Sequence, residues 1–178
     1  MARPYSAENN KDTMKNKEIR INVEELGYEE LCEEDRRLVD KAKEMTRTSN
    51  VPYSRFHVGA AILMANGETV NGSNQENAAF SPTMCAERNA AFQASALYPG
   101  VAFRKIAIAA WTRLHMPDET PDELCFQKQP ISPCGVCRQA LLEYETLYGD
   151  IEVLLYGLDG IFRLKSVKDL LPLSFTEF

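Results

Sequence analysis

Two short cysteine-containing motifs carry the residue types that could bind a metal. Cys85-Ala86-Glu87 places a carboxylate two residues after a thiol, and Cys134 and Cys137 form a CxxC pair. Each motif falls where a helix is expected to begin, and the positive end of a helix lowers the pKa of a thiol. Three thiolates from two helix starts can hold one zinc ion and leave its fourth position open, as in a catalytic site. Glu87 would lie beside that position without being a ligand.

A structural zinc site is the main alternative for these cysteines. It needs a fourth ligand, and the side chains that could supply one are Cys32, Cys125, His57 and His115. A CxxC pair alone is also compatible with a redox pair or with chance. We favour the catalytic interpretation because a structural site would leave Glu87 without a role.

The composition limits the classes of protein to consider. The chain has 178 residues, a length that suits one domain with a real core, and its formal net charge is −6. The acidic balance argues against nucleic acid as the main partner. The longest apolar run, 58–65, is too short to cross a bilayer, so we expect no membrane partner. The first twenty residues lack the apolar core of a signal peptide, which favours a cytoplasmic protein.

The helices and strands that must position these motifs are visible as local patterns. Seven acids within 24–35 predict a solvated segment leading into a helix that ends near Arg47. Strands are expected at 58–64 and 68–74, joined by an Asn66-Gly67 turn. Alanines after Pro82 predict the helix that follows Cys85. The later elements are a strand at 105–111, a loop at 112–129, a helix at 133–144, strands at 151–156 and 161–164, and a short capped helix beginning at Ser166.

This order predicts an α/β fold. Its centre is a mixed sheet of about five strands flanked by helices, partly parallel because helices connect the later strands. We expect a single catalytic domain at 23–178, preceded by an arm at 1–22 that is either flexible or part of a subunit interface.

Five segments together resemble cytidine deaminase, in the order in which that family has them. The segments are 51–61 (VPYSRFHVGAA), 72–80 (GSNQENAAF), 85–91 (CAERNAA), 132–139 (SPCGVCRQ) and 170–175 (LLPLSF). The similarity covers roughly residues 30 to 178. It implies the three-layer sandwich of that family and, for this short three-cysteine type, a homotetramer with active sites shared between subunits.

The resemblance also implies a role for particular residues. Cys85, Cys134 and Cys137 are expected to bind one zinc per chain, and Glu87 to shuttle protons. The residues expected to bind substrate are Phe56 and Ala86 at the base, Asn74 and Glu76 at the ribose, Ser132 near the leaving amine, and Phe175 from a neighbouring subunit. The spacing of Asn74 and Glu76 agrees, because side chains two apart on a strand point to one face.

The charge of the metal site requires compensation. One zinc and three thiolates sum to −1, which makes a bound water harder to ionise. The two helix starts offset part of this charge. We expect Arg88 to offset more by donating to a ligand thiolate, and Arg138 either does the same or lies on the surface.

The expected function is zinc-dependent deamination of cytidine and deoxycytidine to uridine and deoxyuridine in pyrimidine salvage. A deaminase of a modified nucleoside or nucleoside antibiotic is the closest alternative. Editing of cytosine within a polynucleotide would require a basic groove with stacking aromatics, which the charge disfavours. The non-enzymatic alternative is a zinc-stabilised binding module.

Overall fold

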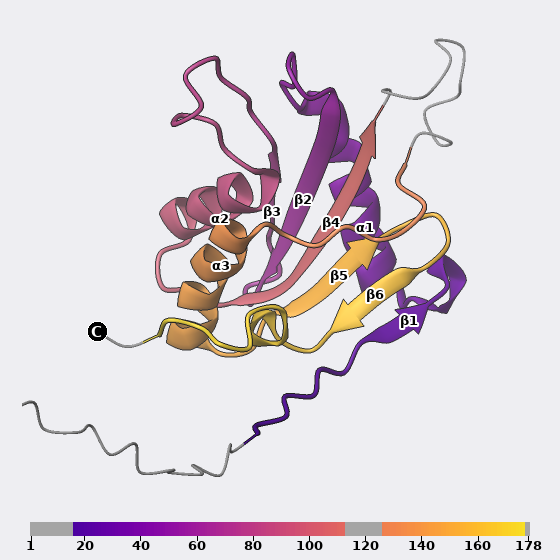
Figure 1. The fold of residues 1–178 in the computed structure, drawn as a ribbon, viewed down its shortest axis with the longest axis vertical. Helices are drawn as coiled ribbons and strands as arrows, with labels where there is room; N and C mark the ends of the chain where they lie inside the picture. Colours follow the sequence, from indigo (N-terminus) through magenta and orange to yellow (C-terminus); the bar gives the residue numbers. More distant parts are fainter. Residues whose placement is uncertain (1–15, 113–125, 177–178) are drawn as a thin grey trace, which may run out of the picture.

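The protein is described by a computed structural model, which covers residues 16–112 and 126–176. A six-stranded sheet in the order β1-β6-β5-β4-β2-β3 forms its centre (Figure 1). The strands are β1 (Glu24–Leu26), β2 (Phe56–Met64), β3 (Thr69–Ser73), β4 (Phe103–Thr112), β5 (Glu152–Tyr156) and β6 (Ile161–Leu164). The α-helices are α1 (Glu33–Met45), α2 (Ala86–Leu97) and α3 (Gly135–Tyr148). Short 3-10 helices occupy η1 (Tyr28–Glu30), η2 (Thr46–Thr48) and η4 (Val167–Leu170).

The sheet is mixed, as the sequence predicts. Only the β4–β5 pair is parallel among the paired strands that the structure describes, and α3 provides its crossover connection. Helix α1 covers one face, while α2 and α3 lie side by side on the other (Figure 1). Alternating residues of β2 show the two layers directly, since Ile62 faces the core under α2 and α3 and Leu63 faces the core under α1. The predicted α/β fold class is therefore confirmed.

One strand was not expected from the sequence. Residues Glu24–Leu26 form β1, which pairs antiparallel with β6, so the sheet has six strands rather than about five. Locally this stretch is an acidic segment with weak strand propensity. Its pairing is supported by a remote side chain, because Arg163 on β6 donates to the Glu24 carboxylate at 2.5 and 2.8 Å.

The β2–β3 hairpin also differs in detail from the simplest expectation. Gly67 has a φ of 87°, and no other residue of this turn has a positive φ. The Met64 N–H donates to the Glu68 carbonyl at 2.8 Å, which leaves three residues in the loop. The turn is therefore the type with glycine in a left-handed bulge position rather than the two-residue turn.

Two buried carboxylates fasten helices to other parts of the fold. Asp35, in the first turn of α1, is 2 % exposed and pairs with Lys105 on β4 at 2.5 Å. Glu145 on α3 is 7 % exposed, and its carboxylate accepts hydrogen bonds from the N–H groups of Ile151, Val167 and Lys168 at 2.7–3.0 Å. The Asp35–Lys105 pair spans 70 residues, and Glu145 reaches Val167 and Lys168 more than twenty residues away. Both contacts satisfy carboxylates that would be costly to bury alone.

Gly72 on β3 allows α2 to approach the sheet closely. A Cβ atom at this position would lie 2.5 Å from the carbonyl oxygen of Ala86 and 2.5 Å from the nitrogen of Ala90, both backbone atoms of α2. The side chains that α2 turns toward the sheet are equally small: Ala86, Ala90, Ala91 and Ala94 are fully buried. The position of α2, and of the side chains at its start, therefore depends on glycine at 72.

We expect Gly72→Ala to lower the free energy of unfolding by about 2 kcal/mol or more, since the added methyl meets backbone that cannot rotate away. Chemical denaturation of the zinc-loaded protein measures this change. Gly135→Ala is the matched control, because a Cβ there meets no atom within 4 Å. Equal stabilities of the two variants would contradict the close-approach argument.

Candidate active site

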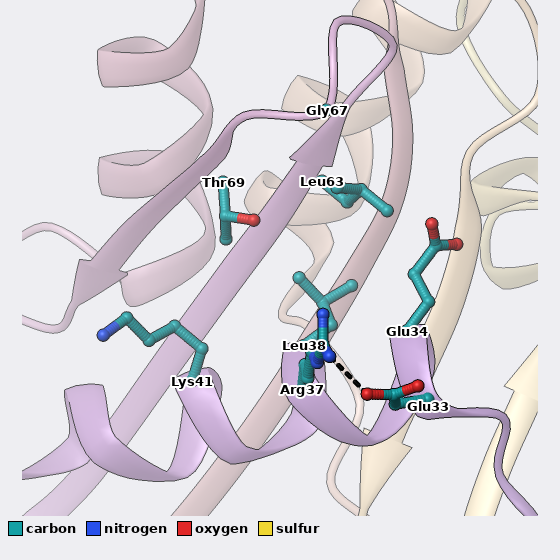
Figure 2. A pocket seen from close by; sticks show the side chains of 8 residues that line it. All are labelled: Glu33, Glu34, Arg37, Leu38, Lys41, Leu63, Gly67 and Thr69. Atoms are coloured by element: carbon teal, nitrogen blue, oxygen red, sulfur yellow. Dashed lines mark hydrogen bonds and ion pairs between the residues drawn. The ribbon is translucent and has the colours of Figure 1, made fainter.

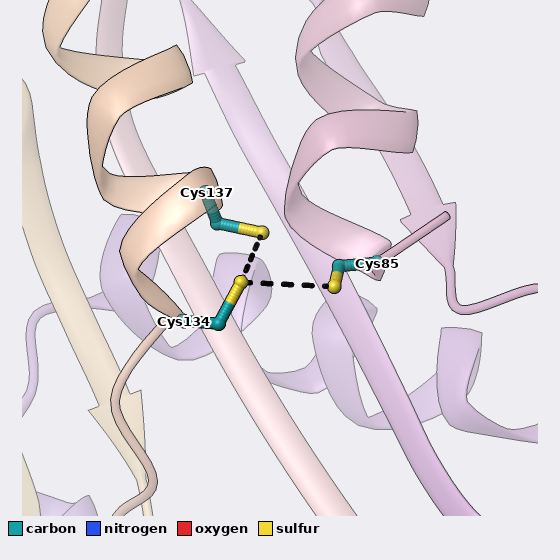
Figure 3. A group of neighbouring side chains, drawn as sticks. All are labelled: Cys85, Cys134 and Cys137. Carbon is teal, nitrogen blue, oxygen red and sulfur yellow. Dashed lines mark hydrogen bonds between the residues drawn. The ribbon is translucent and has the colours of Figure 1, made fainter. Parts of the chain in front are cut away.

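The three cysteines of the two motifs meet between the starts of α2 and α3 (Figure 3). Cys85 is the N-cap of α2 and Cys134 is the N-cap of α3, as the sequence predicts, while Cys137 lies in the first turn of α3. The three Sγ atoms lie within 4.8 Å of one another. Cys134 Sγ is 3.9 Å from Cys85 Sγ and 3.5 Å from Cys137 Sγ.

This arrangement fits one tetrahedral zinc ion, whose bonds to thiolate sulfur are about 2.3 Å long. The three cysteines are the only group of metal-ligating side chains found in the described part of the chain. Neither Cys32 nor His57 joins the cluster; the His57 ring instead stacks on Trp111, with centroids 3.9 Å apart. Cys125 and His115 lie outside the described residues. The donor set thus leaves a fourth position for a reacting molecule.

The thiols of Cys85 and Cys137 shift each other's pKa in opposite directions. A hydrogen bond with the Cys137 thiol, assisted by Arg88, lowers the pKa of Cys85 to about 5 despite partial burial. The same hydrogen bond raises the pKa of Cys137. Arg88 Nη2 lies 3.9 Å from Cys85 Sγ, so its positive charge faces a thiol, as the charge argument anticipated. Arg138 has a different role, because it donates to the carbonyls of Pro133 at 2.8 Å and Leu170 at 2.7 Å.

Glu87 lies in the first turn of α2 and is 4 % exposed. Burial raises the pKa of its carboxyl to about 7, and the nearby Cys85 adds to the rise. A carboxyl group with a pKa close to neutrality can both accept and return a proton, which general acid–base catalysis requires.

An open cavity of about 320 Å³ adjoins the cysteines and Glu87. Eight of the sequence-predicted site residues line it: Phe56, Asn74, Glu76, Cys85, Ala86, Glu87, Ser132 and Cys134. Five further residues line the cavity that were not predicted as site residues, namely Ser54, Val58, Thr83, Met84 and Ile131. Ser54 lies inside the resembling segment 51–61, two residues after Pro52, and proline is a common turn residue.

The two polar residues predicted to bind ribose differ in their surroundings. The Asn74 side chain accepts from Val58 N–H and donates to the Phe56 carbonyl, each at 2.9 Å. Its amide therefore shapes the start of β2, and one donor and one acceptor position remain for a ligand. The Glu76 carboxylate accepts from the N–H groups of Tyr53 and Ser54.

Phe175 does not line the cavity of its own chain. Phe175 is 64 % exposed, and its carbonyl accepts a hydrogen bond from Gln139 Nε2 at 2.8 Å.

The loop predicted at 112–129 lies largely outside the described residues, as does most of the arm at 1–22.

A second hollow of about 480 Å³ lies between the start of α1 and the β2–β3 hairpin (Figure 2). Its described lining residues are all different from those of the first cavity. Its charged side chains neutralise one another in part, since Arg37 pairs with Glu33. Among these described lining residues there is no cysteine, histidine or buried carboxylate, so the chemistry described above belongs to the first cavity.

Comparison with known proteins agrees with the site geometry. Residues 32–148 match the model of the cytidine and deoxycytidylate deaminase zinc-binding region. The cytidine deaminase of Sporosarcina psychrophila is 37 % identical over 142 residues, covering 79 % of this chain and 90 % of that protein. The cytidine deaminase of Halalkalibacterium halodurans is 37 % identical over 139 residues, covering 78 % and 92 %.

Solved structures show the same fold. The cytidine deaminase of Burkholderia pseudomallei superposes with a TM-score of 0.62 at 36 % identity, covering 78 % of this chain and 97 % of that one. The Mycobacterium tuberculosis enzyme gives a TM-score of 0.58 at 28 % identity, covering 79 % and 96 %. The match to a zinc-binding region and the cluster of three cysteines are together consistent with one zinc ion per chain.

Proposed function

We propose, since this chain belongs to the cytidine and deoxycytidylate deaminase family, that it hydrolyses cytidine and deoxycytidine to uridine and deoxyuridine with release of ammonia. The observation that carries the proposal is a buried carboxyl group, Glu87, beside three converging thiols at the wall of an open cavity. The alternative of a modified nucleoside or nucleoside antibiotic is not favoured, because the relatives described above are named cytidine deaminases.

In this proposal Cys85, Cys134 and Cys137 hold the zinc. When bound, the ion supplies Lewis acidity that lowers the pKa of a water molecule toward neutrality. Arg88 offsets the excess negative charge of the three thiolates through its contact with Cys85. The two helix starts act in the same direction.

Glu87 moves the protons of the reaction. It takes a proton from the attacking water and delivers it to the ring nitrogen beside the amino carbon. It then carries the water's second proton to the amine, which leaves as ammonia. The raised pKa of Glu87 supports both directions of transfer near pH 7.

The remaining cavity residues orient the nucleoside. Phe56 packs against the pyrimidine ring, and the Ala86 N–H donates to the base, since the first N–H groups of a helix have no acceptor within it. Asn74 and Glu76 bind ribose hydroxyls. The backbone of Ser132 lies near the leaving amine.

A spectroscopic assay tests the reaction directly. Zinc-loaded protein mixed with cytidine is expected to shift the ultraviolet absorbance steadily toward that of uridine, and chromatography identifies the product. A cytidine spectrum that stays unchanged with one zinc per chain bound would contradict the proposed substrate.

We expect Glu76→Ala to raise the KM for cytidine at least about tenfold, because the ribose loses a hydrogen bond to a charged acceptor. Zinc content should stay at one per chain, because Glu76 is not part of the cysteine cluster. Steady-state kinetics with metal analysis measure both quantities. Glu68→Ala, on the exposed hairpin, is the control. An unchanged KM in Glu76→Ala would remove its ribose role.

We further propose a homotetramer in which Phe175 of one subunit completes the cavity of another. The support is that Phe175 is exposed and lines no part of its own cavity. Phe175→Ala should therefore weaken turnover of the assembled enzyme about tenfold through loss of a buried aromatic contact. Analytical ultracentrifugation alongside the activity assay checks this prediction, and a fully active monomer would contradict the shared site.

We also propose that the enzyme acts in pyrimidine salvage in the cytoplasm, where its thiol ligands stay reduced.

A further inference from the structure

A single helical turn lies between Val51 and the start of β2. The N–H of Arg55 donates to the Val51 carbonyl at 3.1 Å and closes the turn. Pro52 occupies its first position, for which the fixed φ of proline is suited. The next two N–H groups, those of Tyr53 and Ser54, have no acceptor within so short a turn. They are therefore available to an acceptor outside it.

That acceptor is the side chain of Glu76. The N–H groups of Tyr53 and Ser54 both donate to its Oε2, at 3.0 and 3.2 Å. The Ser54 hydroxyl accepts from the Phe56 N–H at 3.0 Å and lies near enough to the carboxylate to help lower the pKa of Glu76. Oε2 is thus held by two backbone N–H groups of the turn, neither of which donates to Oε1. Since Glu76 lines the cavity, Oε1 is the oxygen left for a ligand.

The turn also favours the charged form of this carboxyl. Burial alone would raise the pKa of Glu76, but the Ser54 hydroxyl and the two N–H groups lower it below its ordinary value. The group is consequently ionised at neutral pH and acts only as an acceptor. A neighbouring bond fixes the same segment, because the Glu76 N–H donates to the Asn50 carbonyl at 2.8 Å.

Arg55 ends the turn in an unusual conformation. Its φ is 53°, and no other non-glycine residue in the described ranges has a positive φ. The left-handed conformation redirects the chain so that Phe56 begins β2 at the cavity. The Thr112 hydroxyl, at the end of β4, donates to the Arg55 carbonyl at 3.1 Å. Such strain persists where the surrounding structure enforces it, often at functional sites.

We propose that Ser54 and Arg55 are positioning residues that hold Oε2 of Glu76 so that Oε1 accepts a ribose hydroxyl, and that they thereby determine selectivity for nucleosides carrying that hydroxyl. The proposal rests on the proposed function, because it assigns a support to the ribose contact of Glu76. It predicts an effect on substrate affinity that depends on the sugar and spares the proton chemistry at Glu87.

The test uses zinc-loaded full-length protein and compares cytidine with 2′,3′-dideoxycytidine, which lacks the 2′- and 3′-hydroxyls. Ser54→Ala is expected to raise the KM for cytidine about fivefold, since one hydrogen bond to the charged group is lost. Arg55→Val is expected to raise it about tenfold, because a β-branched residue resists positive φ. For the dideoxynucleoside both variants should stay within about twofold of the parent protein.

A rescue variant separates backbone conformation from charge. Arg55→Gly adopts the same φ without strain, so it is expected to restore most of the cytidine affinity that Arg55→Val loses. If Arg55→Val does not fold, Ser54→Ala still tests the proposal. In a Glu76→Ala background, Ser54→Ala is expected to add no further rise in KM, because both variants remove the same contact.

Four results would overturn the inference, and they are distinguishable. Equal KM changes for both nucleosides, or a fall in kcat alone, would make the turn a general structural element. A Glu76→Ala enzyme with unchanged cytidine KM would remove the ribose contact while leaving the deaminase activity established. A zinc-loaded parent protein that fails to convert cytidine would overturn the proposed function together with this inference.

Discussion

Glu87→Gln is expected to reduce cytidine turnover by at least about a thousandfold, the range in which loss of a general acid–base group falls. Glutamine has nearly the same shape as glutamate but cannot carry a proton between water and the ring. The carboxyl group is 4 % exposed, so bulk water has little access with which to replace it. The absorbance assay measures the loss, and metal analysis should still find one zinc per chain.

The control for this variant is Glu143→Gln. Glu143 is exposed on α3 and belongs to neither the cysteine cluster nor the cavity lining. The turnover of the Glu143→Gln variant should therefore match that of the parent protein. A Glu87→Gln enzyme that keeps more than about a tenth of parental turnover would contradict the proton-shuttle role. Loss of zinc from that variant would instead assign Glu87 to the metal site.

Cys137→Ala is expected to lower bound zinc from one per chain to near zero and to abolish turnover. Two thiolates would remain where the cluster supplies three, and Cys137 is the fully buried member. Because zinc binding contributes to the stability of the folded state, the unfolding temperature of the variant should also fall and become insensitive to added zinc.

Cys32→Ala is the matched control for the loss of a thiol. Cys32 is exposed and lies outside the cluster, so this variant should keep its zinc, its turnover and its unfolding temperature. Retention of one zinc by Cys137→Ala would mean that another side chain completes the site. That result would favour a structural zinc and weaken the catalytic interpretation.

No helix in the described part of the chain is long and apolar enough to cross a membrane. The single-domain division at 23–178, with an arm before it, stays a prediction. So do the individual roles of Phe56, Ala86 and Ser132, which line the cavity but are tested only by substitution.

Local signals in the sequence determined most of the elements, whereas the roles of the site residues were implied by the resemblance of five segments to cytidine deaminase. Alanine spacing marked α2, the expected helix at 133–144 corresponds to α3, and apolar runs of strand length with the Asn66-Gly67 turn marked the strands. These signals work at short range because helix caps and side-chain periodicity depend on residues a few positions apart. Local signals do not account for the approach of Cys85 to Cys134. It depends on α2 and α3 lying side by side on one face of the sheet, which glycine at 72 permits.

Only the tertiary structure decided the features that rest on distant partners. β1 forms because β6 brings Arg163 opposite an acidic stretch that has little strand propensity of its own. The turn before β2 holds Glu76 because segments some twenty residues apart meet in the fold. Likewise, the pKa of Glu87 follows from burial, which no spacing of residues reveals. The residue types of the site are local information, whereas their distances, burial and charge arise from packing.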